Sequence, residues 1–222
     1  MDQRKAQIER KSKETQIQVS LNVDGTGQAK TKTPIGFLDH MLELFVFHGY
    51  FDLDLSVQGD THIDIHHTNE DIGIVLGKAF KKALGEEKAG IKRFGFAFAP
   101  MEGTVGRCVI DLSGRGYFKV NVEGEFPNRM RQGASMVEVT DGMQFLKGQS
   151  QEGYAFAHFE HFMESFAHNL GATLSFTIQN PSDDLHTNLE TMFKSLGLAL
   201  DQATTIDPRR DGKVPSTKGI ID

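Results

Sequence analysis

The sequence contains one cysteine, no tryptophan, few prolines and no long apolar run. One thiol excludes an intrachain disulfide, and Cys108 lies in the apolar stretch GRCVIDLSG, which is typical of a small buried side chain rather than a nucleophile. No apolar segment approaches the roughly 20 residues that cross a bilayer. The polar opening MDQRKAQIERKSKETQ also lacks the apolar centre of a secretion signal. We therefore expect a cytoplasmic protein with no membrane partner.

Positive charge is in the minority as well. The 24 lysines and arginines are outnumbered by 30 aspartates and glutamates, which gives a net charge of -6 and a pI near 5.8. A nucleic-acid surface normally shows a basic excess, so we expect no nucleic-acid partner. The 222 residues, 38% of them apolar, suffice for one large domain or two small lobes with a buried core.

Imidazole and carboxylate groups are concentrated in residues 60–71, which read DTHIDIHHTNED. Such groups are costly to bury unless something pairs with them. If a helix begins near residues 64–67, His66 and Glu70 share one face because they are four positions apart, while His67 points to the side. A metal ion is the simplest partner, and these donor types suit manganese, zinc, iron or nickel alike.

The pattern recurs in the second half of the chain. His40 precedes His66 by 26 positions (66 minus 40), and His161 precedes His186 by 25 (186 minus 161). Each second histidine opens a His-x-x-x-Glu sequence, which ends at Glu70 or at Glu190. The spacing predicts a duplication with two similar lobes whose histidines converge on shared ions. Solvated residues at a helix start would explain either sequence alone, and His40 alone could be a core histidine.

Hydrophobic periodicity predicts an α+β protein of two similar lobes, each a mostly antiparallel sheet backed by helices. We expect helices over residues 37–48, 156–170 and 185–204, and one that begins near residues 64–67 and ends at residue 84. We expect strands over residues 15–23, 50–57, 61–65, 96–101, 105–112, 117–122 and 172–179, with a further strand to Thr33 that forms a hairpin with the first. The predicted divisions are a first lobe (1–89), a second lobe (90–206) with a long loop at about 123–155, and a basic tail (207–222).

Several motifs resemble those of the imidazoleglycerol-phosphate dehydratase family. They include GFLDHML, GDTHIDIHHTNED, DLSGRGY and VPSTKG, and the match covers nearly the whole chain in the right order. The resemblance implies a ribosomal protein S5 domain 2-like duplication, a homo-oligomer of trimers that build a 24-subunit shell, and two manganese ions per subunit bound between neighbouring subunits. The implied metal ligands are the residues that the spacing selects, namely His40, His66, His67, Glu70, His161, His186 and Glu190.

The resemblance also implies an activity, the dehydration of imidazole glycerol phosphate to imidazole acetol phosphate in histidine biosynthesis. A metal on the substrate ring would stabilise an imidazolate while hydroxide leaves. Glu14, in the triplet KET, is the candidate acid or base, although a surface glutamate at a strand start explains it equally well. The implied phosphate ligands, each of which could alone be a solvated polar group, are Arg93, Arg115, Lys194, Ser216 and Lys218.

The chain departs from the family pattern at three places. Thr187 replaces the second member of a His-His pair, so we expect one of the two ions to be held more weakly. Phe96 replaces a usual histidine, and Gly103 ends the turn that is PMDE in the family. Residues 123–155 are also longer than the usual connection. Two alternatives therefore stay open: a related metal-dependent enzyme for another phosphorylated substrate, and a catalytically silent, metal-stapled assembly protein.

Overall fold

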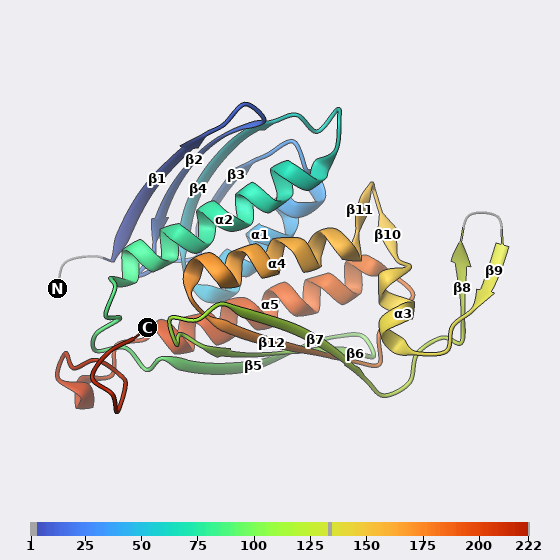
Figure 1. Ribbon diagram of the computed structural model, residues 1–222. Coiled ribbons are helices and arrows are strands. Elements are labelled where there is room, and N and C mark those ends of the chain that lie inside the picture. The colour runs from blue at the N-terminus through green and yellow to red at the C-terminus, as the bar shows by residue number, and fades with distance from the viewer. Residues whose placement is uncertain (1–3, 133–134, 222) are drawn as a thin grey trace.

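The computed structural model describes residues 4–132 and 135–221, and it places four long helices between two four-stranded sheets (Figure 1). The first sheet, in the order β1-β2-β4-β3, consists of β1 (Lys5–Lys11), β2 (Thr15–Asn22), β4 (Asp52–Gly59) and β3 (Ala29–Lys32). The second, in the order β5-β6-β12-β7, consists of β5 (Phe94–Met101), β6 (Thr104–Asp111), β12 (Thr173–Gln179) and β7 (Tyr117–Glu123). The helices between them are α1 (Gly36–Gly49), α2 (Ile65–Leu84), α4 (Phe156–Leu170) and α5 (Leu185–Thr204).

The two sheets share one plan. In the first, β2 pairs antiparallel with β1 and β4, and β3 pairs parallel with β4. In the second, β6 pairs antiparallel with β5 and β12, and β7 pairs parallel with β12. The predicted α+β duplication with mostly antiparallel sheets is therefore confirmed. The division of the chain into units at residues 89 and 206 stays a prediction. Buried side chains from both halves of the chain join one hydrophobic cluster.

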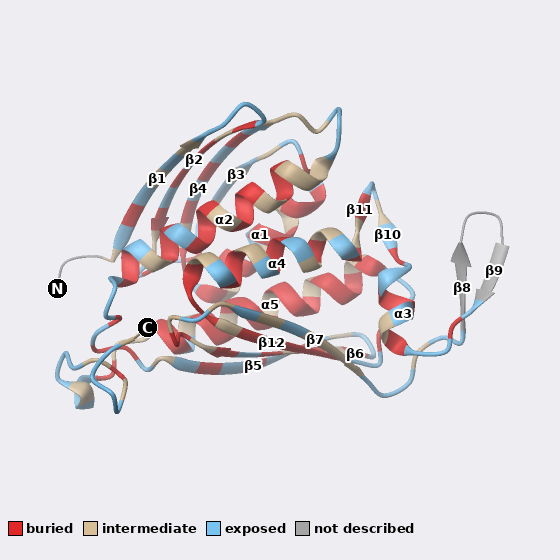
Figure 2. Cartoon of the chain, in the orientation of Figure 1, coloured by how far each residue is buried: buried red, intermediate tan, exposed pale blue. Residues whose placement is uncertain are grey.

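The alternation of buried and exposed residues along the strands explains this layering. On β2, Ile17, Val19 and Leu21 are buried against the helices, and the residues between them face outward. Figure 2 shows the same division, with buried residues on the helices and on the strand positions that face them. Because the helices lie between two sheets, they need wide apolar surfaces, and α5 accordingly buries fourteen of its residues.

Glycines let the central helices approach closely. α2 packs on α4, and α1 packs on α5. A Cβ atom at Gly73 or Gly77 of α2 would lie 2.6 Å from the carbonyl oxygen of Phe162 or Phe166 of α4, respectively. A Cβ atom at Gly197 of α5 would lie 2.4 Å from the carbonyl oxygen of Phe45. We call these two helix–helix contacts the α2–α4 seam and the α1–α5 seam. They bring helices from the two halves of the chain together, and with them the side chains of the candidate site.

Two predicted strand assignments were wrong, and one strand was missed. Residues 61–65 do not form a strand, because Asp64 caps α2 and the helix begins at Ile65. The segment that ends near Thr33 does not form a hairpin with β2, because β3 pairs with β4 instead. The partner of β2 is β1, where charged outward side chains hide the alternation. Such charges are common on edge strands, where they discourage unwanted pairing.

Residues 123–155 are more structured than the predicted loop, although residues 133–134 lie outside the described part. The segment contains β8 (Arg129–Gln132), β9 (Ser135–Glu138), α3 (Gly142–Lys147), β10 (Ser150–Gln151) and β11 (Tyr154–Ala155). The β8–β9 hairpin projects from the body, whereas Phe145, Leu146 and Tyr154 enter the core (Figure 1). The tail holds a short 3-10 helix, η1 (Pro208–Arg210). In the described part of the chain, no helix is both long and apolar enough to cross a membrane.

Candidate metal centre and anion site

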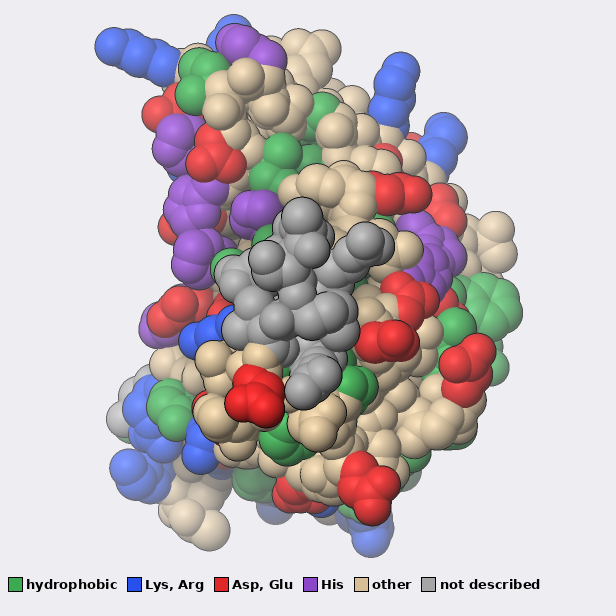
Figure 3. Space-filling model, turned by 90° about the vertical axis from the view of Figure 1, so that its right-hand side faces the viewer, with side chains coloured by type: hydrophobic (Ala, Val, Ile, Leu, Met, Phe, Trp, Pro, Cys, Tyr) green, Lys and Arg blue, Asp and Glu red, His purple; other side chains and the backbone are tan. Residues whose placement is uncertain are grey.

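The helices that carry the two His-x-x-x-Glu sequences begin in the same way. Asp64 accepts a hydrogen bond from the backbone N–H of His66, and Asp184 accepts one from that of His186, each at 3.0 Å. The cap fixes where each helix starts, so the histidine and the glutamate four positions later lie on one face. Histidine side chains gather beside acidic side chains along one edge of the face shown in Figure 3.

The first cluster joins α1 to α5. His186 Nε2 lies 2.9 Å from Glu190 Oε2, and His40 Nε2 lies 3.8 Å from the same oxygen. The two imidazole rings stack with their centroids 5.0 Å apart. One donor atom from each residue lies within 4.8 Å of the other two. His40, His186 and Glu190 therefore form a half-buried group of two nitrogens and one oxygen.

A second set joins α4 to α2 in the corresponding way. His161 Nδ1 lies 2.9 Å from His66 Nδ1, and His66 Nε2 lies 3.6 Å from Glu70 Oε2. All three residues line a hollow of about 350 Å³. Each set thus takes one histidine from one half and a His-x-x-x-Glu face from the other. Within residues 4–132 and 135–221, however, only the first set has three donors this close to one another.

His67 lies apart from the first cluster and faces two carboxylates. Its Nδ1 atom is buried without a hydrogen-bond partner, 3.8 Å from Asp60 Oδ2 and 4.0 Å from Glu14 Oε2. The structure therefore places Glu14, the candidate acid or base, beside a predicted metal ligand. Sequence reasoning missed Asp60, although it opens the polar stretch 60–71. An unpaired imidazole nitrogen near two carboxylates suits a cation.

Lys194 lies beside the first cluster and not with the other predicted phosphate ligands. Its ammonium group is 2.5 Å from Glu190 Oε1, which leaves Oε2 facing the histidines. Burial tends to raise the pKa of Glu190, but Lys194 and His186 outweigh burial and hold that pKa below its ordinary value. Glu190 is therefore an ionised carboxylate with one oxygen directed at His186 and His40.

The other predicted phosphate ligands, Arg93, Arg115, Ser216 and Lys218, gather in a hollow of about 170 Å³. Ser113 and Thr217 line it too, and sequence reasoning missed both, although they belong to the SGR and PSTK motifs. Guanidinium, ammonium and hydroxyl groups together suit an oxyanion. The tail therefore lines, together with the DLSGR turn, a hollow that is a candidate anion site.

Thr187 is only 4% exposed, and its hydroxyl donates to Asp184 Oδ2 at 3.3 Å. It therefore adds no nitrogen donor to the first cluster. Gln151 of β10, which sequence reasoning missed, accepts a hydrogen bond from the backbone N–H of His186 at 3.0 Å. The segment 123–155 thus contacts the start of α5 through this hydrogen bond.

The donor set fits a divalent transition metal. Imidazole nitrogens and carboxylate oxygens bind such an ion at about 2.0–2.2 Å, so donors on opposite sides are up to about 4.4 Å apart. The first cluster would need to close only slightly from its 4.8 Å limit. Its ligand types do not select among manganese, zinc, iron and nickel.

Comparisons with known proteins find relatives that span nearly the whole chain. A sequence profile described as imidazoleglycerol-phosphate dehydratase matches residues 33–200. The imidazoleglycerol-phosphate dehydratase of Geobacillus kaustophilus is 46% identical over 218 residues, which are 98% of this chain and 99% of that protein. The one from Methylorubrum populi is 41% identical over 224 residues, with 98% and 100% covered.

Solved structures show the same fold. A crystal structure of the enzyme from Pyrococcus furiosus, in complex with (S)-C348, superposes with a TM-score of 0.72 at 30% identity and covers 96% of this chain and 99% of that one. The Staphylococcus aureus structure gives a TM-score of 0.70 at 27% identity, with 91% and 99% covered. The chain belongs to the imidazoleglycerol-phosphate dehydratase family, the hydro-lyase family that its motifs predicted.

Proposed function

We propose that this chain catalyses the family reaction, the dehydration of imidazole glycerol phosphate to imidazole acetol phosphate, with manganese as its metal. The family is metal-dependent, and the observation that carries the proposal is the convergence of His40, His186 and Glu190 from opposite halves of the chain. The anion site supports a phosphorylated substrate. A metal cluster and an anion site on one chain are what this reaction requires.

Two ions per chain are proposed, held by different residues. His40, His186 and Glu190 would hold one ion, and His66, His161 and Glu70 would hold the other. His67, whose Nδ1 is unpaired, would add a donor to an ion shared with another copy. A bound divalent ion supplies Lewis-acid stabilisation of the negative charge that develops on the imidazole ring of the substrate.

The remaining residues would bind the substrate and move protons. Arg93, Arg115, Ser216 and Lys218 would hold the phosphate group in their common hollow. Glu14 is about half exposed beside His67, so its carboxyl group can exchange a proton with solvent and with a substrate near the metals. Lys194 keeps Glu190 ionised and directed at the histidines.

The proposed self-association into trimers and a 24-subunit shell is supported by an aromatic stripe on the outer face of β5. Phe94, Phe96 and Phe98 are 56%, 64% and 57% exposed, and Val109, which pairs with Phe96 across β5 and β6, is 45% exposed. Contiguous apolar patches of this kind mark protein contacts.

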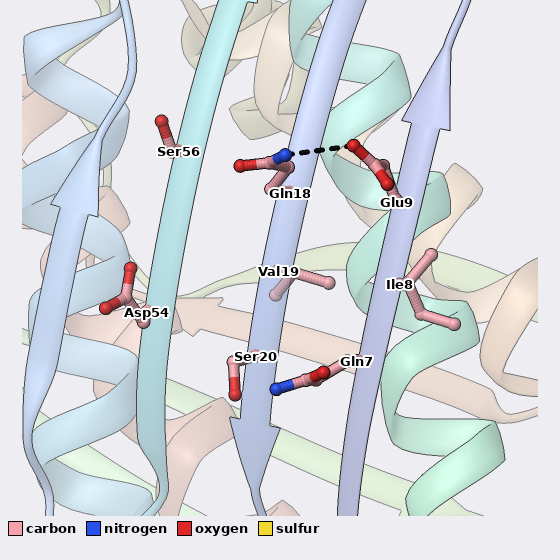
Figure 4. Close-up of a pocket in the computed structure, with 8 residues that line it drawn as sticks. All are labelled: Gln7, Ile8, Glu9, Gln18, Val19, Ser20, Asp54 and Ser56. Carbon is pink, nitrogen blue, oxygen red and sulfur yellow. Dashed lines mark hydrogen bonds between the residues drawn. The ribbon is translucent and has the colours of Figure 1, made fainter.

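The first sheet shows that the fold does not require this stripe. β1 holds the corresponding edge of that sheet, yet its exposed residues are Lys5, Gln7, Glu9 and Lys11. Figure 4 shows Gln7, Glu9 and neighbouring polar side chains on the outer face of β1, β2 and β4. We therefore infer that the aromatic stripe is covered by another copy of the chain.

A charge in the aromatic stripe should dissociate the assembly. Phe96→Glu places a carboxylate where the partner copy would bury the ring, so we expect a smaller particle by light scattering with an unchanged circular dichroism spectrum. Gln7→Glu on β1 is the matched control and should leave the particle size unchanged. Equal particle sizes for wild type, Phe96→Glu and Gln7→Glu would show that the stripe is not an interface.

The function itself is tested by turnover and metal content together. Protein stripped with a chelator should lose activity, and manganese should restore formation of imidazole acetol phosphate as the ions return. Elemental analysis should then find two manganese ions per chain. Metal-loaded protein that binds imidazole glycerol phosphate but forms no imidazole acetol phosphate would rule the proposed function out.

A further inference from the structure

Each sheet is closed at one corner by an arginine that precedes its first strand. Arg4 precedes β1 and Arg93 precedes β5. The Arg4 carbonyl accepts the N–H of Val23 at 2.9 Å, and the Arg93 carbonyl accepts that of Leu112 at 3.1 Å. Val23 and Leu112 are each the first residue after the second strand of their sheet. The two arginines thus occupy equivalent positions in the duplicated fold.

Both arginines form a forked ion pair with an aspartate at this corner. Arg93 donates from Nε to Asp111 Oδ1 at 2.6 Å and from Nη2 to Asp111 Oδ2 at 3.0 Å. Arg4 binds both carboxylate oxygens of Asp24 in the same forked manner. We call these pairs the second clasp (Arg93–Asp111) and the first clasp (Arg4–Asp24). A two-bond fork fixes the plane of the guanidinium group as well as its position.

The third contact distinguishes the two clasps. Arg93 Nη1 donates to the carbonyl oxygen of Pro215 at 3.0 Å, and Pro215 immediately precedes Ser216 of the anion site. Arg4 Nη1 instead donates to the carbonyl oxygen of Thr204 at the end of α5. The second clasp therefore ties the tail to the hollow that Arg93 itself lines, whereas the first clasp closes only a corner of the fold.

The backbone at Arg93 supports this special position. Arg93 has a φ of 76°, in the left-handed region that non-glycine residues rarely adopt, and its N–H is held by the Ala203 carbonyl at 2.8 Å. Such conformations persist where the surroundings fix them, and they cluster at functional sites.

We propose that Asp111 is a positioning residue of the anion site. It orients Arg93 so that three of the five guanidinium N–H groups hold Asp111 and Pro215, which leaves two for the bound anion. Through Arg93 it also fixes the tail segment that presents Ser216 and Lys218. The proposal rests on the proposed function only in taking the anion to be the phosphate group of the substrate.

The test compares Asp111→Asn with Asp24→Asn, the matched change in the first clasp. Inorganic phosphate is the probe, measured by calorimetric titration and as an inhibitor of turnover. Asp111→Asn should weaken phosphate binding and raise KM by about tenfold, the loss expected from a weakened charge-assisted contact, while kcat changes by less than about threefold. Asp24→Asn should leave phosphate binding and KM unchanged, even if it lowers the melting temperature equally.

Two results would overturn the proposal. One is folded Asp111→Asn protein that binds phosphate as tightly as wild type, and the other is an equal loss in Asp24→Asn. If Asp111→Asn does not fold, Arg93→Lys replaces the fork by a single ammonium group and should show the same loss, with wild-type affinity again overturning the proposal. Phosphate binding without any dehydration would contradict the proposed function while leaving the role of Asp111 intact.

Discussion

Glu190→Gln is expected to lower metal affinity by at least about 100-fold, because changes to outer partners of metal ligands already cost about 10–100-fold and Glu190 is a direct donor. Its Oε2 atom is the one oxygen that both His186, at 2.9 Å, and His40, at 3.8 Å, approach. Glutamine keeps the size of the side chain but removes the charge, so Lys194, now 2.5 Å from Oε1, would place an unpaired cation beside the ion. We therefore expect kcat/KM to fall with the bound metal.

The variant is assessed by elemental analysis and by kcat/KM with imidazole glycerol phosphate. Glu43→Gln is the control, because Glu43 is exposed on the same helix as His40 and should change neither quantity. Glu70→Gln, the corresponding change in the second set, should remove the other ion. Wild-type metal content and turnover in Glu190→Gln would mean that the first cluster is not a metal site.

Gly77→Ala is expected to lower the free energy of unfolding by about 1–3 kcal/mol, the usual effect of overpacking a well-packed core. The new Cβ atom would lie 2.6 Å from the Phe166 carbonyl oxygen and 2.9 Å from the Leu170 nitrogen, both backbone atoms that cannot move independently. On an isolated helix the same change would stabilise by up to about 1 kcal/mol. The sign of the change in the free energy of unfolding therefore depends on the packing at the α2–α4 seam.

Denaturant unfolding of Gly77→Ala and Gly36→Ala separates packing from helix propensity. Nothing lies within 4 Å of a Cβ atom at Gly36, the first residue of α1, so that control should change stability by less than about 0.5 kcal/mol. Because the seam also holds His66 beside His161, Gly77→Ala should weaken the second metal set. A Gly77→Ala protein as stable as wild type would contradict this account of the seam.

Local sequence was enough to predict the four long helices and to predict that several candidate metal ligands would lie close together. The capped His-x-x-x-Glu faces depend only on residues within one helical turn, so Glu70 and Glu190 could be placed beside their histidines. The repeat then predicted that His40 and His161 would join them. The structure brings His40 to Glu190 and His161 to His66, across the two halves of the chain.

Other features that depend on long-range contacts could not be predicted. The charged side chains of β1 obscure the alternation of polar and apolar residues that would predict a strand. The partner of β3 depends on sheet order rather than on any turn signal. Gln151 reaches His186 from a segment without a clear pattern. Lys194 matched a phosphate motif, yet the helix places it one turn from Glu190, which is close enough for an ion pair.

We expect donors from the two halves of the chain, His40 on one side and His186 with Glu190 on the other, to close on a metal ion. The most direct measurement is an anomalous difference map at the manganese absorption edge, from crystals grown with manganese. We expect a peak within bonding distance of His40 Nε2, His186 Nε2 and Glu190 Oε2. A map with no peak among these three atoms would contradict this expectation.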